Sequence, residues 1–164
     1  MNYVYIGDLV NTHGIKGEVR ILSEFELKEQ VFKKGFKLYI GRNYEEETIK
    51  TYRKHKNFDM VTLEEIDDIN DVLGYKGDRV YVNRADLKIK DYILQDLIGL
   101  NTYVDDKLIG PVKQVMKSKA HDIIVISGEN KNHMVPRVDE FIKEVNLKER
   151  VLLINNIEGL IDEN

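Results

Sequence analysis

The sequence predicts a mainly β protein made of two small antiparallel β-barrel domains, each with one short helix. Segments that are rich in β-branched and aromatic residues, and that alternate polar with apolar side chains, recur about every ten residues. Turn-forming residues separate these segments. Apolar residues take a helical spacing in only two short stretches, residues 64–74 and 138–145.

The first predicted element is a hairpin, in which residues 3–10 and 18–21 are strands around the turn THGIKGEV at 12–19. Gly14 and Gly17 allow the backbone to take positive φ twice, which leaves Thr12, His13 and Lys16 displayed at one end of a sheet. Loops on a rigid scaffold often contact partners. The alternative is that the two glycines only close the turn.

Four further strands are expected in the first block, at residues 36–40, 48–52, 60–63 and 79–82. A short helix is predicted over 64–74, with Asp67 or Asp68 capping its first turn and Gly74 as a left-handed C-cap. The polar stretch that follows lacks a clear period. We therefore expect a first domain over residues 1–84, a linker over 85–95 and a second domain over 96–164.

The second block repeats the pattern of short strands. Strands are predicted at 102–104, 108–116, 134–136 and 151–154, with a hairpin turn at 105–107. Pro111 inside a strand predicts an edge or a bulge, and the apolar run at 123–126 predicts a strand that is buried on both faces. Val138, Phe141, Ile142 and Val145 have the spacing of a short helix.

Composition limits the classes of function. Hydrophobic residues make up 42% of the 164, which is enough for a buried core. Charged residues make up 33% with a net charge of only −4, so any RNA contact must be local. The absence of cysteine excludes disulfides and thiolate chemistry. No apolar run approaches the roughly 20 residues that span a bilayer, so we expect a cytoplasmic protein with no membrane contact. We also expect a monomer.

An enzyme would have to use the four histidines, and none has a recognised metal-binding spacing. His121 and Asp122 are adjacent, so in an extended segment their side chains point to opposite faces. Gly14 and Gly17 lie in a loop that is too short for a phosphate-binding motif. We therefore predict a protein without catalytic residues, metal or cofactor.

An ordered set of motifs over essentially the whole chain resembles the bacterial ribosome maturation factor RimM family. The motifs are IG at 6–7, THGIKGEV at 12–19, DLIGL at 96–100, GPV at 110–112, AHDI at 120–123 and EGL at 158–160. The resemblance implies a six-stranded barrel similar to those of translation factors, followed by a PRC-barrel. It also implies a chaperone for small ribosomal subunit maturation and rRNA processing that binds the nineteenth small-subunit ribosomal protein.

The resemblance places the contact with that protein just before and within the DLIGL motif, at Tyr92, Ile93, Leu94 and Asp96. Family members commonly carry two adjacent tyrosines and a third aromatic here, whereas this chain keeps only Tyr92. Ile93 preserves an apolar contact but cannot donate a phenolic hydrogen bond. The alternative is that this apolar run packs between the domains.

The most basic window, residues 50–56, predicts a contact with rRNA phosphates through Lys50, Arg53, Lys54 and Lys56. Tyr52 would stack on an unpaired base. The alternative is a solvated strand end that lysines protect from edge pairing. Together with Thr12, His13 and Lys16, the window forms the predicted contact with rRNA or another partner. The competing hypothesis for the whole chain is a stand-alone ligand-binding or regulatory PRC-barrel adaptor.

Overall fold

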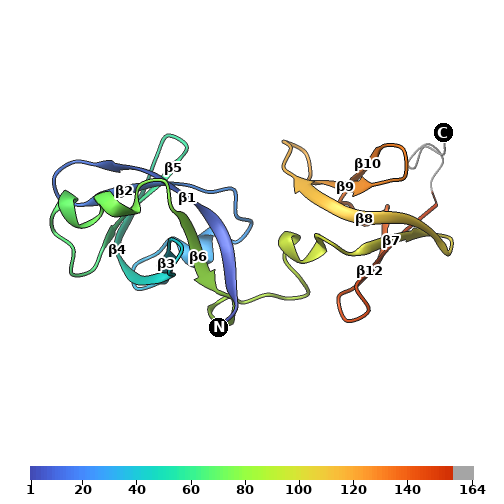
Figure 1. Cartoon of the computed structure of the whole chain (residues 1–164), viewed down its shortest axis with the longest axis horizontal. Helices are drawn as coiled ribbons and strands as arrows, with labels where there is room; N and C mark the ends of the chain where they lie inside the picture. Colours follow the sequence, from blue (N-terminus) through green and yellow to red (C-terminus); the bar gives the residue numbers. More distant parts are fainter. Residues whose placement is uncertain (157–164) are drawn as a thin grey trace. The chain divides into compact units, whose positions relative to one another are not determined.

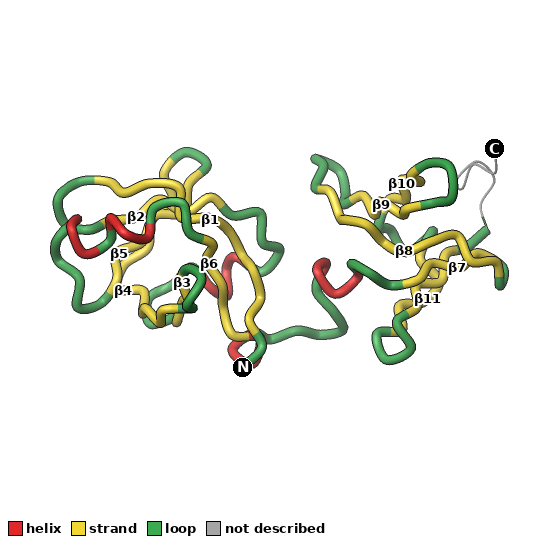
Figure 2. Tube along the Cα trace, in the orientation of Figure 1, coloured by secondary structure: helices red, strands yellow, loops and turns green. Residues whose placement is uncertain are grey.

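The computed structural model divides the chain into two compact units, Met1–Lys90 and a second that begins at Asp91 (Figures 1 and 2). It describes residues 1–156, so the EGL motif at 158–160 lies outside the described residues. The division falls within the segment 85–95 that the sequence predicts as a linker. No helix in the described part of the chain is long and apolar enough to cross a membrane.

The first unit is a closed barrel with the strand order β1-β2-β5-β4-β3-β6. Every neighbouring pair is antiparallel, and β1 closes the barrel by pairing with both β2 and β6. The predicted six-stranded barrel is therefore confirmed. Its strands are β1 (Tyr3–His13), β2 (Glu18–Leu22), β3 (Lys37–Ile40), β4 (Glu45–His55), β5 (Phe58–Leu63) and β6 (Arg79–Asn83).

Alternation along the strands fills the barrel. Successive side chains of a strand point to opposite faces, and the inward set includes Ile6, Ile21 and Val80, which are at most 3% exposed. Gly7 follows Ile6 at a register shift of β1. A Cβ there would lie 2.5 Å from the carbonyl oxygen of Leu22, so glycine permits the close approach of β1 to β2.

The helix predicted over 64–74 is wrong. Two 3-10 turns stand there instead, η1 (Ile69–Asp71) and η2 (Leu73–Tyr75). Asp68 does cap η1 by accepting from the N–H of Asn70 at 2.9 Å, but Gly77 rather than Gly74 takes positive φ. The apolar spacing misleads because it does not mark a buried face, since Leu73 is 49% exposed. The unit's α-helix, α1 (Lys28–Val31), and a further turn, η3 (Arg84–Asp86), were not predicted.

The second unit is a six-stranded sheet with the order β10-β9-β8-β7-β12-β11. Its neighbouring pairs are antiparallel except for β12 with β7, which is parallel. A 3-10 turn, η4 (Leu94–Leu97), leads into the sheet. The strands are β7 (Asn101–Val104), β8 (Lys107–Met116), β9 (Ile123–Ser127), β10 (Asn132–Pro136), β11 (Ile142–Asn146) and β12 (Val151–Ile154).

Of two local predictions in this unit, one is partly correct and one is wrong. Pro111 lies in β8, which has β7 and β9 as neighbours and is therefore not an edge strand. Register shifts flank it at Ile109 and Lys113, so of the two alternatives the bulge is the one found. The helix predicted over 138–145 is wrong, because only one turn forms, with the N–H of Phe141 and Ile142 donating to Val138 O. Strand β11 then begins, and its apolar residues still pack on the core.

The core of the second unit lies under the middle strands and η4. The apolar run at 123–126 is largely buried, as expected for a strand covered on both faces. Leu100 and aliphatic residues from η4 and from four strands, β8, β9, β10 and β12, form this core. Its buried members are Leu94, Leu97, Leu100, Val112, Ile124, Ile126, Val135, Leu152 and Ile154.

Candidate partner-binding surfaces

The segment that follows β5 holds the β1–β2 loop in place. Gly14 and Gly17 have φ of +73° and +82°, as the sequence predicts. The carbonyl oxygen of Ile15 accepts from the N–H of Ile69 at 3.1 Å. A Cβ on Gly17 would stand 3.1 Å from Ile66, which shows how closely the loop packs on the following segment. The loop therefore presents its exposed side chains from a fixed backbone.

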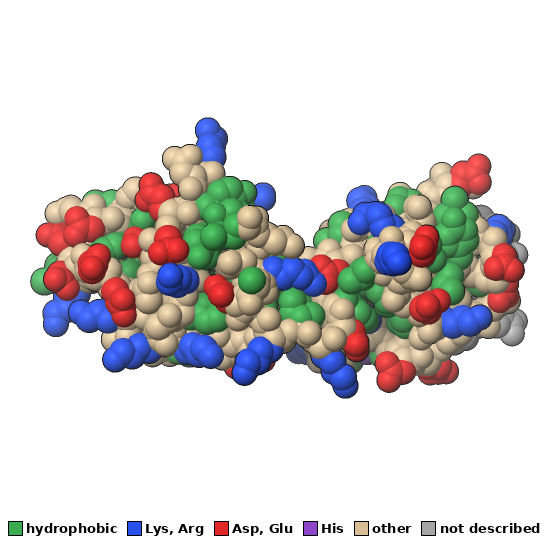
Figure 3. Space-filling view, turned by 90° about the horizontal axis from the view of Figure 1, so that it is seen from below, with side chains coloured by type: hydrophobic (Ala, Val, Ile, Leu, Met, Phe, Trp, Pro, Cys, Tyr) green, Lys and Arg blue, Asp and Glu red, His purple; other side chains and the backbone are tan. Residues whose placement is uncertain are grey.

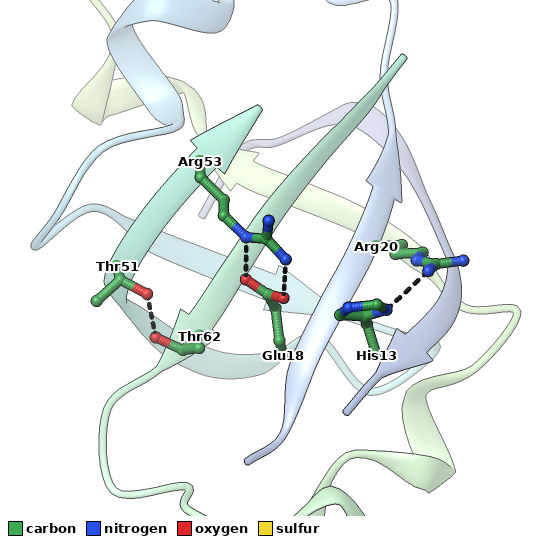
Figure 4. A network of polar contacts seen from close by, with 6 residues as sticks. All are labelled: His13, Glu18, Arg20, Thr51, Arg53 and Thr62. Carbon is green, nitrogen blue, oxygen red and sulfur yellow. Dashed lines mark hydrogen bonds and ion pairs between the residues drawn. The ribbon is translucent and has the colours of Figure 1, made fainter. Parts of the chain in front are cut away.

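The outer face across β1, β2, β5 and β4 carries two polar pairs, each with an arginine as the donor (Figure 4). Arg20 donates to Nδ1 of His13 at 2.7 Å, and because arginine has no acceptor, this nitrogen of His13 must be the acceptor. The guanidinium of Arg53 donates two hydrogen bonds to the Glu18 carboxylate, from Nε at 2.9 Å and from Nη2 at 2.7 Å. These hydrogen bonds lower the pKa of Glu18, with smaller contributions from His13 and His55.

The loop and the basic window come together around Glu18. His13 and His55 both act electrostatically on this carboxylate, and Arg20 lies 5.7 Å from the ring of Phe58, which is the register partner of His55. Carboxylates offset the charge of two residues that were predicted to contact rRNA phosphates. Arg53 is paired with Glu18, and Lys50 lies 3.8 Å from Asp67. Lys16, Lys54 and Lys56 are exposed, and Thr12 is half-buried.

Tyr52 has a structural role that the sequence did not predict. Its hydroxyl donates to Asp59 at 2.7 Å, and its ring stacks on Phe32 with the centroids 5.9 Å apart. Burial raises the pKa of Tyr52 to about 12. Lys28 pairs with the same Asp59 carboxylate at 2.6 Å. Tyr52 thus binds a buried carboxylate instead of presenting both ring faces to a base.

In the second unit, η4 removes two predicted contact residues from the surface. Ile93 is 1% exposed and Leu94 is 8% exposed, so the expectation that they form an exposed apolar contact is wrong. The turn directs Leu94 into the core of its own unit. Asp96 holds this turn, because its carboxylate accepts from the N–H of Ile93 at 2.9 Å.

Tyr92 lies half-buried beside this turn and packs against the same core. Arg137 donates to the Tyr92 hydroxyl at 3.3 Å, and its guanidinium lies 5.9 Å from the ring centroid. Arg137 is in turn 3.6 Å from Asp122, which also pairs with Lys117 at 3.9 Å. Sequence reasoning missed Arg137, for which the only signal was its place after the Val135-Pro136 pair.

Comparison with known proteins identifies both units. Residues 4–87 match the RimM N-terminal domain, and residues 94–160 match the RimM PRC barrel domain. The chain belongs to the RimM family. The resemblance inferred from the motifs is thereby confirmed, and so is the fold class. Among the described residues, no three His, Asp or Glu side chains gather in a way that could hold a metal ion.

Two relatives, both named "Ribosome maturation factor RimM", match over nearly their whole length. One from Staphylococcus haemolyticus is 37% identical over 166 residues, which cover 97% of this chain and 99% of the relative. One from Exiguobacterium is 35% identical over 170 residues, which cover 99% of both proteins. RimM family membership therefore extends across both units.

Proposed function

We propose that this chain is a non-enzymatic assembly factor for the small ribosomal subunit that supports processing of its rRNA. The observation that carries this proposal is the match to relatives named as ribosome maturation factors, which covers 97% of the chain at 37% identity. In this proposal the second unit binds the nineteenth small-subunit ribosomal protein, and the first unit contacts rRNA.

The proposed protein contact is centred on Tyr92, with Asp96 at its edge. Tyr92 is already fixed by the core beneath it and by Arg137 beside it. A ring that is ordered before binding loses little conformational entropy on association, which favours affinity. Asp96 holds η4 through its hydrogen bond to Ile93, so it contributes by shaping the surface next to Tyr92.

The proposed rRNA contact combines the β1–β2 loop with the exposed end of the basic window. Lys16, Lys54 and Lys56 supply the positive charge, and Thr12 and His13 precede Lys16 in the loop. Contacts of this kind bind phosphates and weaken as salt rises. When this chain binds a partner, it shifts that partner toward the assembly-competent conformation. The shift is only as large as the difference between the chain's affinities for the partner's conformations.

The protein contact is tested by titrating the full chain with the purified nineteenth small-subunit protein. We expect Tyr92→Ala to weaken binding by about 30-fold or more, which is the scale of an interface hot spot. Leu108→Ala is the matched control, because it also removes an exposed apolar side chain of the second unit. Unchanged affinity of Tyr92→Ala with an unchanged melting temperature would exclude Tyr92 from the contact. Failure of the wild-type chain to bind would exclude this partner.

A further inference from the structure

A group of tyrosines covers the outside of the barrel over β1, β6 and β3. Tyr5, Tyr81 and Tyr39 are register partners on these three neighbouring strands, and Tyr3 shares the outward direction of Tyr5. The residues between them point inward and are buried. We call this the tyrosine face, and with one residue from the β3–β4 turn its accessible members are Tyr3, Tyr5, Tyr44 and Tyr81. Tyr39 is only 5% exposed and packs against the ring of Tyr3.

Tyr44 belongs to this face although its backbone has an unfavourable conformation. It ends the β3–β4 turn with φ +51°, a conformation that is unusual for a bulky side chain. Glycine or asparagine would fit this position with less strain. The turn places the Tyr44 ring parallel to that of Tyr3, with centroids 4.0 Å apart and planes 2° apart, and edge-on to Tyr81. A strained residue that nevertheless presents an aromatic ring suggests a functional use of the ring.

The hydroxyls of two of these tyrosines are engaged within the unit. Tyr5 donates to Asp8 at 2.9 Å, and Tyr39 donates to Glu46 at 3.3 Å. Burial is the main cause that raises the pKa of both, and the carboxylates add to it. These bonds fix the orientation of the rings. Tyr5 and Tyr44 each remain 38% exposed, so ring surface is available to a ligand.

Arginine accompanies the aromatic rings. The guanidinium of the exposed Arg79 lies 5.3 Å from the centroid of the Tyr5 ring, and exposed Arg42 belongs to the same turn as Tyr44. Unpaired bases stack on tyrosine rings and on guanidinium planes, while arginine also binds phosphate. We propose that the tyrosine face is a stacking platform for unpaired nucleotides of RNA. This rests on the proposed function and names the form of RNA that the first unit binds.

The arrangement of the rings on the tyrosine face fits RNA. Parallel and edge-on tyrosine rings with a guanidinium beside them form the kind of surface on which unpaired bases stack. Among the exposed large apolar residues of the first unit, Ile15, Leu22 and Leu73 belong to other segments, whereas Met1 lies two residues before Tyr3. Base stacking is also tolerant of sequence, because every base has an aromatic face.

The test measures binding of the full chain to a short unpaired RNA and to a blunt duplex of the same length. Tyr44→Gly removes the ring and relieves the strain at positive φ, and Tyr5→Leu keeps an apolar side chain but removes a stacking surface. We expect each to lower affinity for the unpaired RNA by about 5- to 150-fold and to leave duplex affinity unchanged. The chain has no tryptophan, so tyrosine fluorescence can be followed, and the part of its quenching by RNA that is lost in Tyr44→Gly reports stacking at this face.

Two control variants sharpen the result. Tyr44→Phe keeps the ring and should bind as the wild type does, and Leu73→Ala should also bind normally because it removes an exposed apolar side chain outside the tyrosine face. Wild-type affinity of Tyr44→Gly and Tyr5→Leu for the unpaired RNA would overturn the proposal. That result leaves the Tyr92 titration unaffected, so the two failures can be told apart.

Discussion

Glu18 is the residue at which the charges on the outer face of the first unit meet. Arg53 binds it through two hydrogen bonds, and His13 and His55 act on it electrostatically. Its acidic charge was visible in the sequence as part of the THGIKGEV motif, but its partner was not, because Arg53 is 35 residues away. Only the pairing of β2 and β4 with β5 brings the two side chains together.

The first prediction concerns the pH dependence of this pair. The pKa of Glu18 is lowered in the folded state, so the pair stabilises the protein above the ordinary carboxyl pKa of about 4.3. That stability is lost as pH falls through the lower folded pKa. Arg53→Gln should therefore reduce the melting temperature at pH 7 and lose this effect in acid. A difference that persists unchanged to the most acidic pH at which the chain folds would contradict the assignment, and Lys54→Gln serves as the control.

Arg137 acts on the proposed protein contact through Tyr92. It donates to the tyrosine hydroxyl and is itself tied to Asp122. We expect Arg137→Ala to weaken binding of the nineteenth small-subunit protein, and to do so only when Tyr92 is present. A double-mutant cycle with Tyr92→Ala measures this dependence, and fully additive losses would show that Arg137 does not work by positioning Tyr92.

At the scale of elements, strands were predictable and helices were not. Alternating side chains identify β3, β5 and β6 locally, because one face of each strand meets the core. The spacing in 64–74 resembles a helix, yet Ile69 uses its N–H to hold the β1–β2 loop. In the second unit, the apolar run at 93–94 was expected at the surface and is buried by η4. Both errors arise because contacts between different segments decide these structures. The spacing of apolar residues within one segment carries no information about such contacts.

The glycines of the β1–β2 loop allow a matched test of how that element is held. Both have positive φ, so alanine at either position should cost about 1–2 kcal/mol of unfolding free energy. Gly17→Ala should cost more than Gly14→Ala, because its Cβ would press on Ile66, whereas nothing lies within 4 Å at Gly14. Denaturant unfolding measures both. An equal or larger cost at Gly14 would show that the loop is not packed as described.

The tyrosine face is also an element-scale property that the sequence concealed. Tyr3 and Tyr5 indicate a strand by their composition, but the face exists only because β6 and β3 bring Tyr81 and Tyr39 into register. Tyr52, which the sequence favoured as the base-stacking residue, is instead bonded to Asp59. The periodicity was therefore sufficient to predict the barrel and insufficient to predict which of its outer surfaces is aromatic.

At the scale of the whole molecule, the chain is two units with separate cores. We expect a core substitution to act on one unit alone. Leu97→Ala should destabilise the second unit by about 2–5 kcal/mol, and Ile21→Ala should do the same to the first. Hydrogen exchange resolved along the chain measures each unit separately. Equal loss of protection in both units from either substitution would contradict independent folding.

The central claim, that this chain assists assembly of the small ribosomal subunit, is tested most directly by depleting it in its native host. The measurement is the ratio of precursor to mature small-subunit rRNA in the free small subunits of a sedimentation profile. The account predicts that precursor rRNA accumulates and that the wild-type chain restores the normal ratio. An unchanged ratio and an unchanged profile after complete depletion would contradict it.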